Sequence, residues 1–167
     1  MGKMGLSNLG IFHTVIGLVA LIAAILSFIR YGKVNLSHPT GKIYFFGTVT
    51  TSLTALGISK HGGFNPGHVF SILIAILVVV AFFLYARRKG NNASRFIENF
   101  CLSLSFFLSL IPTVNETFTR VPIGHPLAKD ITDPLIGKTL LTLFILFIVG
   151  SVYQFIKQKR INKTIHA

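Results

Sequence analysis

The stretch NPGHVFSILIAILVVVAFFLYARRK, residues 65–89, decides the fold of this chain. Asn65 can cap a helix that begins at Pro66, and the apolar run then continues without a charge as far as Arg87. At a rise of 1.5 Å per residue, a helix over residues 66–86 is about 30 Å long, which is the thickness of the hydrocarbon core of a bilayer. The stretch therefore predicts a membrane-spanning helix that ends at a basic cluster.

The composition of the whole chain extends this interpretation to a polytopic membrane protein. Of the 167 residues, 51% are hydrophobic and only 12% are charged, whereas a soluble domain has roughly 25% charged residues. Four further apolar segments, each long enough to cross the bilayer, can be drawn over residues 9–29, 41–59, 96–112 and 134–156. We therefore predict an all-α protein of about five transmembrane helices, which forms a single domain over residues 1–167.

The basic residues are placed as orientation signals and not as a nucleic-acid-binding surface. The net charge is +12, but the cations lie in short clusters beside the apolar segments. Most of the 16 lysines and arginines follow the first, third and fifth segments. The positive-inside rule then predicts an N-terminus outside and a C-terminus in the cytoplasm. We expect the lipid bilayer, and no nucleic acid, as the partner.

Two further features bear on the packing and the loops. The second segment carries a stripe of small residues, which favours close contact between helices in lipid: Thr48, Ser52, Ala55 and Ser59. A long connection is predicted on the outer side from Thr113 to Asp133, and long connections are more often functional than short ones. Glu98, near the cytoplasmic end of the fourth segment, is expected to pair with Arg95 or Arg88.

Four histidines come to the predicted outer side, namely His13, His61, His68 and His125. His13 lies about one turn inside the first segment, and His68 lies in the first turn of the third helix. The helix N-terminus favours a neutral imidazole at His68, and a metal or haem iron requires the neutral form. We therefore predict a site near the outer face in which His13 and His68 bind haem b or a divalent metal ion, with His61 and His125 as further metal ligands.

Three of these four histidines also have a plainer interpretation. His13 can form a hydrogen bond between two helices. His61 and His125 can be exposed loop residues near a membrane interface. His38 is the one histidine predicted at the cytoplasmic helix ends, and His166 falls in the tail.

Three functional hypotheses remain open from these residues. The first is a redox protein that transfers electrons through haem b or a metal ion held by His13 and His68. The second is a zinc or copper site of histidines and an acid, with or without hydrolysis, although no HExxH or GxSxG motif is present. The third is a non-catalytic accessory protein that packs against other membrane proteins or binds lipid. Whether the chain is an enzyme is left open. Cys101 is the only cysteine, so the chain cannot form an intrachain disulfide.

The segments HTVIGLVAL, SHPTGKIYFFGTVTTSLTAL, GFNPGHVFSIL and YARRKGN follow one another between residues 13 and 95. In this order they resemble a family of predicted bacterial inner-membrane proteins, catalogued as a domain of unknown function, number 2306. The matching positions are His13, Gly17, His38, Gly41, Lys42, Tyr44, Pro66, His68, Ser71, Leu73, Arg87, Arg88, Gly90 and Asn91.

The resemblance implies an inner-membrane location and no settled activity. It also implies two layers of histidines, an arrangement similar to that of two-haem membrane cytochromes of the b type. This chain has the outer pair, His13 and His68, but no histidine near Arg95, so His38 stands alone in the inner layer.

Overall fold

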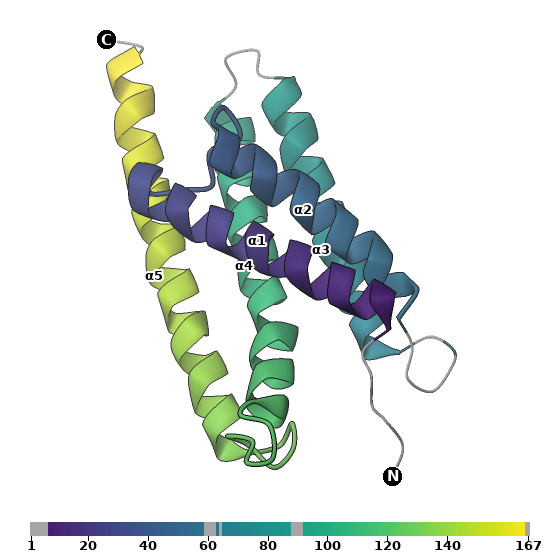
Figure 1. Cartoon of the computed structure of the whole chain (residues 1–167). Coiled ribbons are helices and arrows are strands. Elements are labelled where there is room, and N and C mark those ends of the chain that lie inside the picture. Colours follow the sequence, from purple (N-terminus) through teal and green to yellow (C-terminus); the bar gives the residue numbers. More distant parts are fainter. Residues whose placement is uncertain (1–6, 59–62, 64, 88–91, 166–167) are drawn as a thin grey trace. The chain divides into compact units, whose positions relative to one another are not determined.

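The computed structural model describes residues 7–58, 63, 65–87 and 92–165. In these residues the chain is all-α, with five helices in the order α1 (Asn8–Tyr31), α2 (Pro39–Leu56), α3 (Pro66–Ala86), α4 (Asn92–Arg120) and α5 (Pro134–Ile165) (Figure 1). Among the described residues, α1, α3, α4 and α5 are long and apolar enough to cross a membrane. The predicted all-α class and helix number are confirmed.

The helices begin where their local sequence predicts. Pro39 and Pro66 occupy the first turn of α2 and α3, where a proline costs no hydrogen bond. At the start of α5, the Asp133 carboxylate accepts a hydrogen bond from the Leu135 N–H at 2.9 Å. α1 ends at Gly32, whose φ of 73° is the left-handed conformation that closes a helix without a Cβ clash.

α2 differs from the other helices because it does not qualify as a candidate span. It has 18 residues and includes several threonines and glycines. Two of its hydroxyl groups donate within the helix: Thr51 to the Gly47 carbonyl at 2.7 Å, and Thr54 to the Thr50 carbonyl at 3.0 Å. The buried Thr40 hydroxyl has no hydrogen-bond partner among the described residues. The prediction of about five spans is therefore supported for four helices, and α2 is shown only to be a helix.

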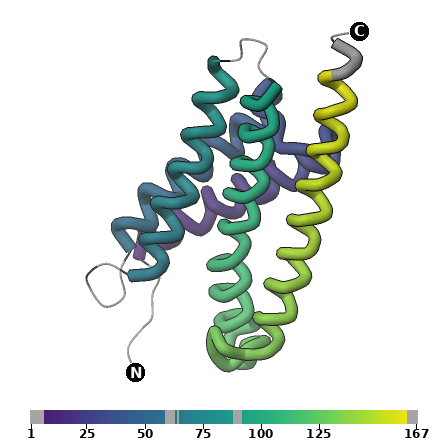
Figure 2. Tube along the Cα trace, turned by 180° about the vertical axis from the view of Figure 1, so that it is seen from behind, coloured from purple at the N-terminus to yellow at the C-terminus, as the bar shows by residue number. Residues whose placement is uncertain are grey.

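The chain divides into two compact units, Met1–Ser105 and Phe106–Ala167, with the division inside α4. In the first unit, α2 packs against both α1 and α3. Both views show α2 alongside α3, and Figure 1 shows α1 crossing α2 (Figures 1 and 2). The buried side chains of α1 are small: Ala20, Ala23, Ala24 and Ser27, with Gly10 near the start.

α1 and α2 touch along a ladder of small residues. A Cβ added at Gly47 would lie 2.8 Å from the Ala20 Cβ, and one added at Gly17 would lie 3.3 Å from the Thr51 Cγ2. Such contacts let two backbones approach closely, which stabilises helix pairs in lipid. These contacts run in opposite directions along the two helices, so the pair is antiparallel.

The small-residue stripe predicted on α2 differs from the face of α2 that contacts α1. Thr48 and Ser52 are buried as that stripe requires, whereas Ser59 lies outside the described residues. The residues that face α1 are Gly47, Thr51 and Thr54. The prediction missed them because α2 has two neighbours and therefore two packed faces.

In the second unit, the boundary predicted after residue 112 is wrong. α4 continues through Pro112 to Arg120, so the connection covers residues 121–133 and not 113–133. Within this helix the Thr113 hydroxyl donates to the Ser109 carbonyl at 2.7 Å. A proline inside a membrane helix is tolerated because neighbouring groups can satisfy the backbone carbonyl that it leaves without an N–H partner. The connection folds back on α4, since the Ala128 N–H donates to the Phe118 carbonyl at 2.9 Å.

Candidate functional site

His13 belongs to the contact between α1 and α2. Its Nδ1 lies 3.1 Å from the Thr54 Oγ1, and the Thr54 hydroxyl already donates to the carbonyls of Thr50 and Thr51 at 3.0 Å each. The Thr54 oxygen must therefore accept, which assigns the ring proton of a neutral His13 to Nδ1. The interhelical hydrogen bond considered for His13 from the sequence is present. The same bond leaves the lone pair of His13 on Nε2.

His68 belongs to the start of α3, and it is only 6% exposed. Asn65 and His68 form a reciprocal capping box: the Asn65 Oδ1 accepts from the His68 N–H at 3.3 Å, and the His68 Nδ1 accepts from the Asn65 N–H at 3.1 Å. Because Nδ1 is an acceptor here, the proton of the neutral ring lies on Nε2. A metal at Nε2 would displace that proton, and a metal at Nδ1 would replace the cap.

The structure also describes His125 and His38. His125 is exposed in the connection of the second unit, where its N–H donates to the Pro122 carbonyl at 3.2 Å. His38 is the N-cap of α2, and its ring stacks on Tyr31 with centroids 4.3 Å apart. His61 and His166 lie outside the described residues.

No group of three or more His, Cys, Asp or Glu side chains that could hold a metal ion occurs in the described part of the chain. The predicted metal set of His13, His61, His68 and His125 therefore stays a prediction, as does the haem b pair. The geometry shows that both histidines form hydrogen bonds within the fold, His13 with Thr54 and His68 with Asn65.

A buried polar cluster on α4 was missed by the sequence interpretation. Glu98 is 1% exposed, so its carboxylate is buried. Its expected pairing with Arg95 or Arg88 stays a prediction, and Arg88 lies outside the described residues. The neighbouring Asn99 accepts a hydrogen bond at 3.1 Å from the ammonium of Lys33, which follows α1 in the chain. Ionisable residues inside membrane helices are functional candidates by default, because their burial in lipid is costly.

The same face of α4 carries a second polar contact. The oxygens of Tyr44 and Ser105 lie 2.7 Å apart and are both fully buried. Ser105 also donates to the Leu102 carbonyl at 2.9 Å, so the Tyr44 hydroxyl is the donor to Ser105. The sequence signal was present, since Glu98, Ser105 and the apolar Leu102 between them share one helical face. In the sequence, these polar residues indicated only that this segment is less apolar than the other spans.

Four helices that are long and apolar enough to span a membrane place the chain in the class of helical integral membrane proteins. No family model, no curated protein and no solved structure matches it. The resemblance to the uncharacterised bacterial family accordingly rests on its four short segments.

Proposed function

We propose that the chain is a non-catalytic accessory protein of the bacterial inner membrane, which packs against another membrane protein. Its N-terminus lies outside and its C-terminus lies in the cytoplasm. The observation that carries the proposal is the use of both outer histidines in the fold, His13 in a bond to Thr54 and His68 in a capping box with Asn65.

The two rings differ in a way that favours structural roles. A bis-histidine haem needs a lone pair from each of two imidazoles. The bond to Thr54 leaves His13 Nε2 with a lone pair, whereas the cap on α3 uses the lone pair of His68 at Nδ1. Binding a cofactor through both rings would therefore cost the cap, which is worth about 1 kcal/mol.

α5 offers an apolar surface for a protein partner. Some of its large side chains pack inside the second unit, namely Ile136, Leu140, Leu143, Phe144 and Phe147, and others are exposed. Leu146 is 61% exposed and Val149 is 60% exposed. Another membrane protein could pack against this face through van der Waals contacts, which drive helix association in lipid.

A site for haem b or a divalent metal ion is the second candidate. The specific observation in its favour is the Nδ1–H form of His13, since metal-bound histidines usually donate their other ring N–H to an oxygen. In this alternative the chain has a redox role, and His68 becomes the second ligand after its capping bond opens.

Purified protein in mild detergent separates the two candidates. We would measure the absorption spectrum and the metal content of the wild type and of His68→Gln, because glutamine at this position can keep the capping box. The accessory role predicts no Soret band, no stoichiometric metal and equal stability of the two proteins. A Soret band or bound metal that is lost in His68→Gln would establish the cofactor role instead.

A photocrosslinking amino acid at position 146 tests the partner directly. The accessory role predicts one discrete protein adduct in native membranes, and the same probe at exposed Ile131, in the connection, should not give it. Adducts with lipid alone at position 146 would contradict packing through α5.

A further inference from the structure

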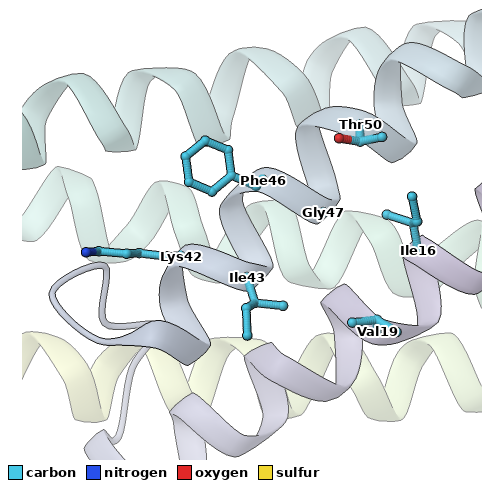
Figure 3. Close-up of a pocket in the computed structure, with 7 residues that line it drawn as sticks. All are labelled: Ile16, Val19, Lys42, Ile43, Phe46, Gly47 and Thr50. Carbon is cyan, nitrogen blue, oxygen red and sulfur yellow. The ribbon is translucent and has the colours of Figure 1, made fainter.

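A shallow groove of about 420 Å³ follows the crossing of α1 and α2 (Figure 3). Its lining consists of two residues from α1 and five from α2, namely Ile16, Val19, Lys42, Ile43, Phe46, Gly47 and Thr50. The groove exists because Gly47 has no side chain and meets Ala20 closely, so that the larger side chains stand on either side of the contact. Figure 3 shows Ile43 and Val19 near each other and Lys42 at one end.

The groove has the length of one bilayer leaflet. From Lys42 to Thr50 along α2 the distance is about 12 Å at 1.5 Å per residue. Half of a hydrocarbon core of about 30 Å is about 15 Å. The wall is open to lipid, since Val19 is 50% exposed and Phe46 is 62% exposed. An acyl chain can therefore lie along the whole groove within a single leaflet.

The charge of the groove is concentrated at its end. Lys42 lies in the first turns of α2 and is exposed, and within the described residues it forms no ion pair with any acidic side chain. A lysine stem lies comfortably along apolar surface while its ammonium reaches the level of the head groups. The Lys42 ammonium at the end of an apolar groove therefore matches a phospholipid, whose negative phosphate lies at the end of an apolar acyl chain.

We propose that this groove binds one anionic phospholipid, with an acyl chain against Ile16, Val19 and Ile43 and the phosphate at Lys42. The positive-inside orientation places Lys42 in the cytoplasmic leaflet, where anionic lipids attract basic residues. The proposal goes beyond the accessory role and shares with it only the orientation of the chain in the membrane.

Native mass spectrometry of the full chain measures the binding. Detergent-purified protein is titrated with phosphatidylglycerol and with phosphatidylcholine of the same acyl chains. We expect the wild type to retain phosphatidylglycerol about fivefold more strongly, which is the ratio that about one lysine contact gives. Lys42→Gln should abolish this preference. Val19→Trp, at an exposed position, fills part of the groove and should lower the retention of both lipids roughly tenfold. This is the loss expected when about two methylene groups of the acyl chain no longer contact the groove.

Lys159→Gln is the matched control, since it removes one exposed lysine from α5 and should leave the preference intact. Melting curves in the same detergent establish that each variant is folded. Equal loss of preference in Lys42→Gln and Lys159→Gln would overturn the proposal, because bulk charge would then explain it. It would also be overturned if Val19→Trp kept full lipid retention, or if that change instead dissociated a dimer of the chain.

Discussion

Gly47 determines how closely α1 and α2 approach. Its missing side chain is the space into which the Ala20 methyl group packs, and Gly17 plays the same part opposite Thr51. In lipid there is no hydrophobic gain from bringing two apolar helices together. The stability of this pair therefore comes from close van der Waals contact and from the bond between His13 and Thr54.

We predict that Gly47→Ala destabilises the first unit by about 1–3 kcal/mol, because the new methyl group would lie 2.8 Å from the Ala20 Cβ and must push the helices apart. Gly150→Ala is the matched control, since nothing lies within 4 Å of a Cβ there, and it should gain up to about 1 kcal/mol from helix propensity. Reversible unfolding in mixed micelles measures both. Equal effects at the two glycines would show that the contact is not what stabilises the pair.

His68 provides the second prediction at this scale. His68→Ala should cost about 1 kcal/mol, because it removes half of the capping box on α3. His68→Gln should keep most of that stability, since a glutamine at the third helical position can accept from the backbone N–H of Asn65. The same unfolding measurement applies to both variants. Losses of equal size would indicate that the ring has a role which glutamine cannot replace.

At the scale of elements, the connection between α4 and α5 is an ordered turn. The Asp130 carboxylate accepts hydrogen bonds from both the N–H and the hydroxyl of Thr132. Next to it, Ala128 packs with Val114 and Ile136. The Thr132 hydroxyl, followed by its N–H, holds the pKa of the Asp130 carboxyl below its ordinary value of 3.8.

This lowered pKa predicts the acid response of the turn. A depressed carboxyl pKa stabilises the folded turn at every pH above 3.8, and this stabilisation is lost as the pH falls through the lower folded value. Amide exchange at Thr132, corrected for its intrinsic pH dependence, should therefore accelerate progressively as the pH falls from about 3.8 through the lowered folded value. In Asp130→Asn the acid-induced step should vanish. Protection of Thr132 that persists unchanged to about pH 2 would contradict the prediction.

At the scale of the whole molecule, the sides on which the basic helix ends lie depend on whether α2 crosses the bilayer. If it does, the C-terminal ends of α1 and α3 lie on the same side of the membrane. If it does not, Arg30 and Arg87 lie on opposite sides. α2 is about 27 Å long at 1.5 Å per residue, close to the thickness of the hydrocarbon core, and it packs against spans on two faces.

We predict that α2 crosses and that the basic ends are cytoplasmic. Single cysteines at positions 30, 87 and 125, in a Cys101→Ser background, test this with a membrane-impermeant reagent on intact cells. Position 125 should be labelled from outside, and positions 30 and 87 only after lysis. Labelling of position 30 or 87, but not both, would mean that α2 stays on one side.

The sequence by itself determined which segments are helices and where most of them begin. Those features depend on neighbours in the chain: Asn65 and Pro66 start α3, Pro134 starts α5, and long apolar runs predict spans. Local signals were less reliable at Pro112, which usually ends a helix in water but is tolerated here inside α4.

Only the tertiary structure decided what the side chains do. His13 meets Thr54 across 41 positions of sequence, and Tyr44 meets Ser105 across 61, so no local pattern could pair them. The small residues of the second segment predicted that α2 packs closely against other helices, but they did not determine which of its faces contacts α1. The position of Gly47 opposite Ala20 settles that, because contacts between helices depend on how two complete surfaces fit together.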